Sequence, residues 1–318
     1  MSRLTRPSQQ PIYSAAEKFI DEAMRSEGSL FVPDRRVWKL ENVREFHLLF
    51  VEQEDTSKDS FNKKLVRQLE SASDDTRVLA AELMFFHSLG VFNQKSVSKR
   101  AMIEPLLEGT GIEIPKEFDS ALEDGVSNQG AALSHRDKHI RLLAELMLAW
   151  KQLSAEEVDD LLSDAASFWR LVFDIPGRAG DITQRNMLIH LVFPDEFEPI
   201  AAAGVKNDIV KAFGEYVSDK DANIDQKLAE IRQALSGKHG QEFTFYQDDV
   251  KAHWGTVKES ALDLPSDPVD AIGAMMNAMY PDDDLRELIL NVLADAVETA
   301  HEVNPKCWGL GPDAKHTY

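Results

Sequence analysis

The sequence predicts an all-α fold, an irregular array of many helices with at most a few short strands, and three observations support this. Apolar residues recur at three- and four-residue spacing along almost the whole chain of 318 residues, which is the period of an amphipathic helix. Alternating runs of β-branched residues, which are typical of strands, are nearly absent. Apolar residues make up 43% and charged residues 28% of the chain, as in folded globular proteins with a substantial core.

The clearest helix is predicted from residue 74 to residue 89. Ser73 is a suitable N-terminal cap, Asp74 and Asp75 supply first-turn acids, and Gly90 is placed to end the helix. Its apolar stripe consists of Leu79, Leu83, Phe86 and Leu89. A second stripe of the same period consists of Ile140, Leu143, Ala144, Met147 and Leu148.

Helices are also expected through the second half of the chain. Ser154 and Glu157 have the spacing of a capping box, and the helix that they start should run to Pro176 and Gly177. Short strands are possible at residues 29–32 and 243–246. Further helices are expected over residues 181–192, 206–215, 222–236, 267–279 and 282–302.

We expect two helical domains, residues 1–130 and residues 131–318. The boundary lies where glycines collect and the helical period fades, over residues 109–134. Residues 1–100 hold 16 basic and 15 acidic side chains, whereas residues 101–318 hold 19 and 40. The total formal charge of −20 therefore divides into +1 and −21. This charge excludes a uniformly basic DNA-coating protein and leaves only the first hundred residues as a nucleic-acid surface.

Several features favour a cytoplasmic protein that does not enter a membrane. The single cysteine, Cys307, cannot form an internal disulfide, which suits a reducing compartment. The first ten residues are polar and contain no apolar signal core. No stretch approaches the roughly 18 uninterrupted apolar residues of a membrane-spanning helix.

No motif predicts catalysis, a cofactor or a metal. The phosphate-binding pattern G-x-x-x-x-G-K-[ST] occurs nowhere. His135 and His139 could share a helix face, but a third zinc ligand and the glutamate of H-E-x-x-H are missing, so a solvated helix start is expected. The segment Gly237–Gly240 is expected to end a helix, and Cys307 to be a small buried thiol. An enzyme with an unrecognised site would need a polar pocket that joins the two histidines to a carboxylate.

The candidate nucleic-acid-binding residues are basic clusters in the first third of the chain. They could hold phosphates, and Trp38 and Phe61, which lie among them, could stack on bases. The two aromatic residues are equally suitable as core residues. The six candidates are Arg35, Arg36, Lys39, Lys63, Lys64 and Arg67.

Two sets of residue phrases follow one another along residues 28–254. The first is Gly28-Ser-Leu30, Trp38-Lys-Leu-Glu-Asn42, Ser60-Phe61, Lys64-Leu65, Gln68-Leu69 and Leu79-Ala-Ala-Glu-Leu83. The second is Asn186-Met-Leu-Ile-His-Leu-Val-Phe-Pro194-Asp-Glu-Phe-Glu-Pro-Ile200, Lys206, Ile209-Val-Lys-Ala-Phe213, Asp225, Leu228, Ile231-Arg232 and Phe245-Tyr-Gln-Asp248. Together they resemble the helical N-terminal region that precedes the AAA+ motor in McrB-like proteins of methylation-dependent restriction and related anti-phage defence. Most of these residues are expected to be structural.

The resemblance implies a recognition or regulatory module without catalytic residues, because that family hydrolyses nucleotide in a motor domain with a P-loop. Either the motor lies beyond residue 318, or the chain works with a separate motor or nuclease. We expect the module to select a target, such as modified DNA, or to dock such a partner. The alternative is an interaction or assembly scaffold with no nucleic-acid contact, which the acidity after residue 100 favours.

Overall fold

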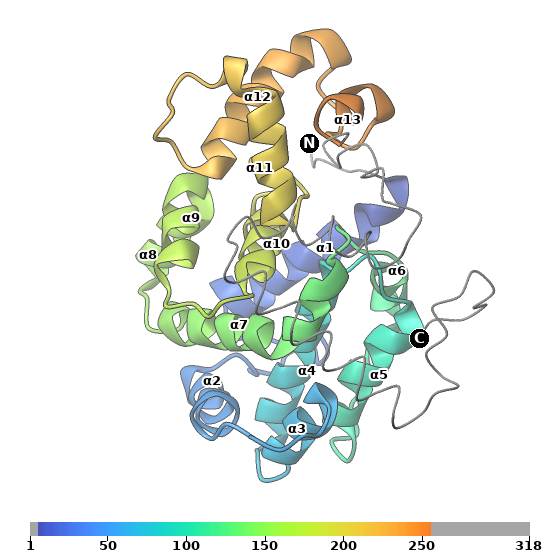
Figure 1. Ribbon diagram of the computed structural model, residues 1–318. Coiled ribbons are helices and arrows are strands. Elements are labelled where there is room, and N and C mark those ends of the chain that lie inside the picture. The colour runs from blue at the N-terminus through green and yellow to red at the C-terminus, as the bar shows by residue number, and fades with distance from the viewer. Residues whose placement is uncertain (1–5, 256–318) are drawn as a thin grey trace, which may run out of the picture. The chain divides into compact units, whose positions relative to one another are not determined.

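The computed structural model describes residues 6–255, and the all-α prediction is confirmed over this range (Figure 1). No strand occurs in the described segment, where the only bridge of β type joins Val91 to Ser127. The short strands considered at residues 29–32 and 243–246 are therefore wrong, since both segments form turns and bends. None of the helices in this range is both long and apolar enough to cross a bilayer.

The α-helices follow one another with short connections. They are α1 (Gln10–Phe19), α2 (Leu40–Phe46), α3 (Phe61–Gln68), α4 (Asp74–Leu89), α5 (Ser96–Leu107), α6 (Asp119–Glu123), α7 (Arg136–Trp150), α8 (Ala155–Ser163), α9 (Ala165–Asp174), α10 (Ile182–Val192), α11 (Ala203–Ala212), α12 (Ile224–His239) and α13 (Asp248–Trp254). Four short 3₁₀ turns complete the described part: Pro7–Gln9, Lys116–Phe118, Gly130–His135 and Gly214–Tyr216.

Two helices continue directly into π-helical segments. Helix α1 is followed by η2 (Ile20–Arg25), and α2 is followed by η3 (His47–Glu52). The helical path is unbroken at both junctions, where Ile20 and His47 keep right-handed helical torsion angles. π-Helical turns are rare and often occur beside functional sites, so the surfaces next to η2 and η3 are of particular interest.

The chain divides into two compact units between Val250 and Lys251. The domain boundary predicted near residue 130 lies inside the first unit. One hydrophobic core there contains buried side chains from Ile12 to Ala201, on both sides of residue 130. The helices predicted over residues 267–279 and 282–302, together with Cys307, lie outside the described residues.

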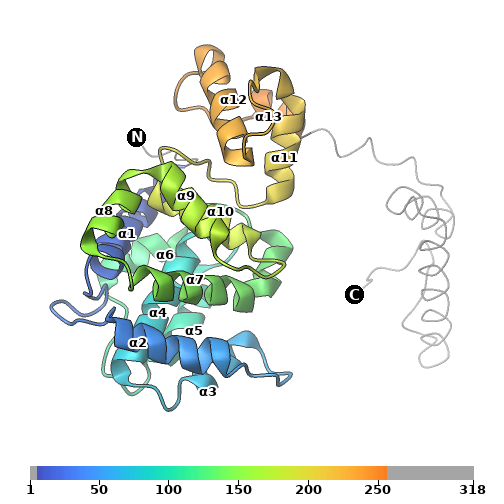
Figure 2. The same ribbon diagram turned by 90° about the vertical axis from the view of Figure 1, so that its left-hand side faces the viewer.

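Helix α4 is the centre of the first unit. It packs against α1, α2, α5, α6 and α7, and 13 of its 16 residues are buried. Ser73 caps it as predicted, because its hydroxyl accepts a hydrogen bond from the Thr76 amide, and the helix stops at Gly90. In two perpendicular views, α2 and α3 lie at one end of this unit and α11 and α12 at the other (Figures 1 and 2).

The single helix expected between Ser154 and Pro176 is in fact two helices. The capping box of Ser154 and Glu157 forms as predicted and starts α8. Asp164 then adopts an extended conformation, with φ −123° and ψ 103°, and its carboxylate accepts hydrogen bonds from the amides of Ala166 and Ser167. Asp164 thereby ends α8 and caps α9, so the apolar period continued across a break that the spacing alone did not reveal.

The last predicted helices of the first unit agree with the structure. Residues 181–192 correspond to α10, residues 206–215 to α11 with its following turn, and residues 222–236 to α12. Helix α12 continues three residues further than expected, to His239, and ends at Gly240 with a positive φ of 85°. The glycine-bounded segment is therefore a helix end, as predicted.

Candidate functional site

The predicted nucleic-acid-binding residues that precede α2 all lie beside carboxylates of the same chain. Three ion pairs involve them, and all three acidic partners come from the first third of the sequence. The pairs are Arg35 with Asp75 at 2.6 Å, Arg36 with Glu27, and Lys39 with Glu41 at 3.5 Å. Each cation is thus opposed by a nearby negative charge.

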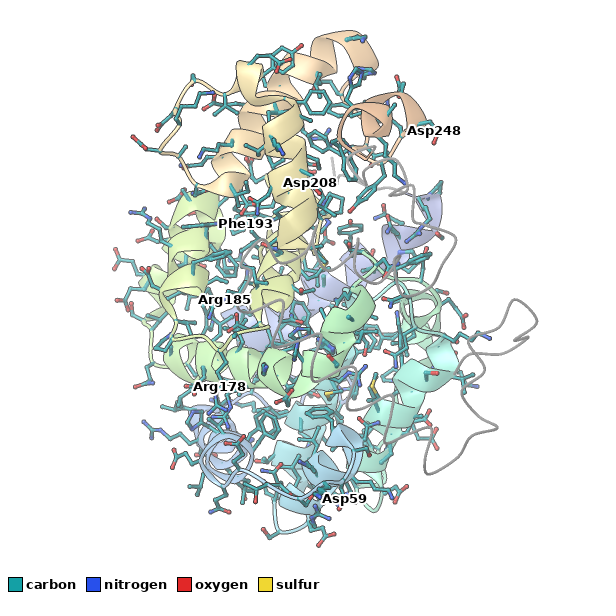
Figure 3. All side chains as sticks on the ribbon, viewed as in Figure 1. Asp59, Arg178, Arg185, Phe193, Asp208 and Asp248 are labelled. Atoms are coloured by element: carbon teal, nitrogen blue, oxygen red, sulfur yellow. The ribbon has the colours of Figure 1, made fainter. Side chains whose placement is uncertain are left out.

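The second predicted group, on α3, folds against the acidic loop that precedes the helix. Arg67 pairs with Asp55 and, at 2.7 Å, with Asp59, which lies beside α3 (Figure 3). Hydrogen bonds to Asp59 and Asp55 raise the pKa of the Arg67 guanidinium. The Lys64 ammonium donates to the Asp55 backbone carbonyl at 3.2 Å, while Lys63 is exposed and lies in the field of Asp59.

The two basic groups belong to different parts of the chain. Lys39 immediately precedes the continuous helix of α2 and η3, whereas Asp55, the partner of Arg67, follows its end. A DNA backbone would have to replace carboxylates at each group separately, which weakens the electrostatic gain of phosphate contact.

His139 is buried, so the expectation of a solvated helix start is wrong for this residue. Its Nε2 lies 3.1 Å from the Gly180 carbonyl oxygen, and its ring lies 5.4 Å from that of His87. His87 Nδ1 is 2.7 Å from Gln184 Oε1. Burial lowers the pKa of His87 to about 3 and that of His139 to about 4, so both rings are neutral at pH 7.

This histidine cluster does not have the composition of a metal site. His87 Nε2, His139 Nδ1 and Gln184 Nε2 are buried without a hydrogen-bond partner among the described residues. The charges that act on His87 are those of Arg136 and Lys99, which are positive and would repel a metal cation. No group of three or more histidine, cysteine or acidic side chains suited to a metal occurs in the part of the chain that the structure describes.

The polar residues in the first set of resembling phrases meet in the core. The buried Glu82 carboxylate, on α4, accepts hydrogen bonds from the Trp38 indole at 2.6 Å, the Phe31 amide at 2.9 Å and the Ser29 hydroxyl. Burial raises the pKa of Glu82, and these donors oppose the rise. Trp38 is therefore a core residue that fixes the segment before α2 to α4, and it is not available to stack on a base.

Polar residues of the second set join four helices. The Lys206 ammonium, on α11, is 2.6 Å from the Asp225 carboxylate on α12 and 2.8 Å from Asn186 Oδ1 on α10. Trp169, on α9, donates to Asp225 at 3.0 Å. The side chains of Lys206 and Asp225 are only 1% and 2% exposed, so this ion pair is part of the interior.

A second buried ion pair holds the segment after α12. The Arg232 guanidinium pairs with Glu198, with one contact of 2.7 Å, and both side chains are less than 10% exposed. The guanidinium also lies 4.3 Å from the centre of the Phe243 ring and 5.5 Å from that of Phe245. These contacts are structural, as expected for most residues of the two sets.

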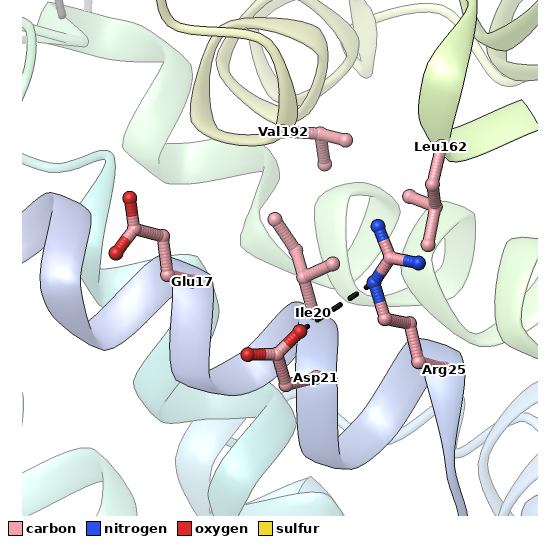
Figure 4. A pocket seen from close by; sticks show the side chains of 6 residues that line it. All are labelled: Glu17, Ile20, Asp21, Arg25, Leu162 and Val192. Carbon is pink, nitrogen blue, oxygen red and sulfur yellow. Dashed lines mark ion pairs between the residues drawn. The ribbon is translucent and has the colours of Figure 1, made fainter. Parts of the chain in front are cut away.

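The candidate binding site is a groove of about 240 Å³ beside the π-helical segment η2 (Figure 4). Ile20 of η2, Val192 of α10 and Leu162 of α8 supply its apolar floor, and in this view the Arg25 guanidinium lies between Ile20 and Leu162. Glu17 and the Asp21–Arg25 ion pair, which measures 3.5 Å, form its charged rim. We refer to these six residues as the η2 groove.

Acidic residues outnumber basic ones in η2 and α8, two of the elements that line the η2 groove. Arg25 also pairs with Asp159 of α8 at 3.0 Å, so the two helical segments are linked at the rim. Arg25 is the only basic residue on either segment. The acidic residues of η2 and α8 are Asp21, Glu22, Glu156, Glu157, Asp159 and Asp160. No residue spacing in the sequence relates α8 to η2, so the groove is not visible from sequence patterns.

Comparison with known proteins gives no relative from which the role of this groove could be inferred. No protein-family model, curated protein or solved structure matches the chain. The resemblance to McrB-like N-terminal regions therefore depends on the residue phrases alone. Function must be argued from the surfaces themselves.

Proposed function

We propose that this chain is a non-catalytic helical module that recognises a protein partner, as the N-terminal region of a McrB-like defence protein would. The partner suggested by the resemblance is an AAA+ motor or a nuclease. The single cysteine, which cannot form an internal disulfide, supports a cytoplasmic location for this module. Catalysis would then belong to the partner or to another domain.

The proposal rests on a difference between two charged surfaces. The predicted DNA-contacting cations are mostly paired with acidic residues of the chain, whereas several carboxylates of α1 and α8 are unpaired among the described residues. Five of the six predicted DNA-contacting side chains contact oxygen atoms of acidic residues of the same chain. By contrast, the carboxylates of Glu17 in the η2 groove and of Glu156 and Asp160 on α8 form no ion pair or hydrogen bond within the described residues. An accessible acidic surface favours a basic protein partner over a nucleic acid, because phosphates would be repelled.

The interior supports a module of fixed shape rather than an active site. The buried polar side chains of α4 and of α10–α12 bind one another or backbone atoms. Among the described residues, His139 contacts the Gly180 carbonyl, and its hydrogen bond is not to a carboxylate. The pocket that an enzyme would need at His135 and His139 therefore has no support from this geometry.

The experiment that tests this function measures mass in solution. The full chain is mixed with each purified product of the neighbouring genes, and light scattering after size-exclusion chromatography gives the mass of any complex. We expect a complex of defined stoichiometry with one of these proteins. If the measured mass remains that of the chain by itself in every mixture, the proposal is contradicted.

A DNA titration separates this function from target selection on DNA. Methylated and unmethylated duplexes are titrated with the chain at two salt concentrations, because phosphate contacts weaken steeply with salt. We expect no complex that depends on the six basic residues. Binding at low salt that is lost when Lys63 and Arg67 are changed to glutamate would favour the DNA function instead.

A further inference from the structure

The η2 groove has the size of a site for one or two side chains. Its volume of about 240 Å³ is below the range of roughly 300–1,000 Å³ that is usual for small-molecule pockets. A leucine, isoleucine or methionine side chain from another protein would occupy part of it and contact Ile20, Leu162 and Val192. These three floor residues are half-buried, and the groove exposes more polar than apolar surface, so an occupant gains more from the charged rim than from the floor.

The rim of the groove is negatively charged on the side of η2. Glu17 is exposed and its carboxylate is unpaired among the described residues. Asp21 and Asp159 share the single cation Arg25, which leaves one uncompensated negative charge in this trio. A cation placed beside the floor would therefore find Glu17 directly and the Asp21–Asp159 pair next to it.

The helix that forms this rim changes its winding at the groove itself. Helix α1 is α-helical up to Phe19, and the π-helical segment starts at Ile20, the first floor residue. The wider turn includes Asp21 and Arg25, so three of the six groove residues come from this irregular segment. Local departures from regular helix of this kind are frequent at binding and catalytic sites.

We propose that the η2 groove binds a basic segment of a partner protein, in which one apolar side chain is flanked by lysine or arginine. The apolar side chain contacts the floor, and the flanking cations approach Glu17 and the Asp21–Asp159 pair, which carries one negative charge more than Arg25 neutralises. This inference rests on the proposed protein-recognition function and adds the surface and the chemistry of the partner. It assigns a binding role to residues that lie outside both basic clusters.

A methyl-group NMR titration tests the inference directly. The full chain, labelled at isoleucine, leucine and valine methyl groups, is titrated with a synthetic peptide that has one leucine between pairs of lysines. We expect shift changes at the methyl groups of Ile20, Leu162 and Val192, and weaker binding at higher salt. Absence of shifts, or shifts confined to methyl groups elsewhere, would overturn the inference.

Two variants separate the rim from the floor, each with a matched control. Glu17→Lys reverses a rim charge, and Leu162→Ser shortens the floor; each should weaken peptide binding by about tenfold, the effect of ~1.4 kcal/mol. Glu113→Lys makes the same charge change at another exposed carboxylate, and Val97→Ser shortens a side chain that is 75% exposed. Both controls should bind as the unchanged chain does. Equal losses in variants and controls would show attraction to overall negative charge and would contradict a site in the groove.

Failure of this inference can be told apart from failure of the proposed function. The affinity of the same variants for the partner found by light scattering is then measured. If the complex forms but Glu17→Lys and Leu162→Ser leave its affinity unchanged, the function stands and the groove is the wrong surface. If the peptide binds the groove but no complex forms with any neighbouring gene product, the groove stands as a peptide-binding site and the proposed function is contradicted.

Discussion

The indole nitrogen of Trp38 donates a hydrogen bond of 2.6 Å to the carboxylate of Glu82, and neither residue is exposed to solvent. The bond joins the segment before α2 to the middle of α4. It accounts for a tryptophan that, from sequence, was equally suitable for stacking on a base. The predictions below test this contact and three other features of the fold.

Removal of the indole donor should destabilise the protein. Trp38→Phe keeps an aromatic ring but takes one hydrogen bond from a buried carboxylate, so we expect a loss of about 1–3 kcal/mol in the free energy of unfolding. Urea denaturation at pH 7 measures the loss. Val97, which is 75% exposed, gives the control Val97→Ala, which should change stability by less than about 0.5 kcal/mol. Equal effects of the two substitutions would contradict the structural role of Trp38.

The buried ion pair between Lys206 and Asp225 should behave as a unit. Lys206→Met leaves the Asp225 carboxylate buried without its cation, which should lower the free energy of unfolding by about 3–5 kcal/mol. The double variant Lys206→Met with Asp225→Asn removes both charges and should recover a large part of this loss. A double-mutant cycle by urea denaturation gives the coupling energy. Additive effects of the two substitutions would show that the two groups do not interact.

The buried histidines should make the protein lose stability as the pH falls below about 6.5. An unfolded histidine has a pKa near 6.5, whereas burial lowers the pKa of His87 to about 3 and of His139 to about 4. Between these values the unfolded chain binds more protons than the folded chain does. The free energy of unfolding therefore decreases as the pH is lowered, by roughly 2 kcal/mol per histidine at pH 5. The nearby cations Arg136 and Lys99 also oppose protonation of His87.

A substitution isolates this histidine effect from the carboxylates that titrate in the same range. The free energy of unfolding is measured from pH 7 to pH 5 for the unchanged chain and for His87→Gln. The variant should show a shallower decrease, because one of the two protons is no longer taken up on unfolding. His135→Gln, at a residue that is only half-buried, is the control. A slope unaffected by His87→Gln would mean that this ring is not buried as a neutral group.

Gly125 should not tolerate a side chain. A Cβ atom at this position would lie 2.1 Å from the backbone oxygen of Val91, which is far inside van der Waals contact. Gly125→Ala should therefore lower the free energy of unfolding by about 1–3 kcal/mol. Gly237, within α12, has no atom within 4 Å of its Cβ position, and Gly237→Ala should instead stabilise the helix by about 0.5–1 kcal/mol. Thermal denaturation should show a lower midpoint for Gly125→Ala and a higher midpoint for Gly237→Ala than for the unchanged chain.

Local sequence patterns predicted the helices because caps and apolar spacing act over a few residues. Ser73, Ser154 and Gly240 fulfil the predicted capping roles. The break at Asp164 was missed because the apolar period continues across it, although an aspartate three residues before Ser167 is itself a capping signal. The π-helical winding of residues 20–25 has no comparable signal in the sequence.

The candidate site was harder to predict, because its residues come from distant parts of the chain. Ile20, Leu162 and Val192 belong to three separate elements, so no spacing relates them. The basic clusters were visible, but their pairing with acids depends on the fold for Arg35 and Asp75, which are 40 residues apart. Arg67 and its partners Asp55 and Asp59 are close enough in sequence that the pairing could have been anticipated.

The most direct test of a protein-recognition role is a comparison of two probes at one low salt concentration. The affinity of the full chain is measured by fluorescence anisotropy for the lysine-flanked leucine peptide and for a methylated DNA duplex. We predict that the peptide binds, that Glu17→Lys weakens its binding, and that the duplex does not bind. Binding of the duplex but not of the peptide, with loss of duplex binding on changing Lys63 and Arg67 to glutamate, would contradict this prediction.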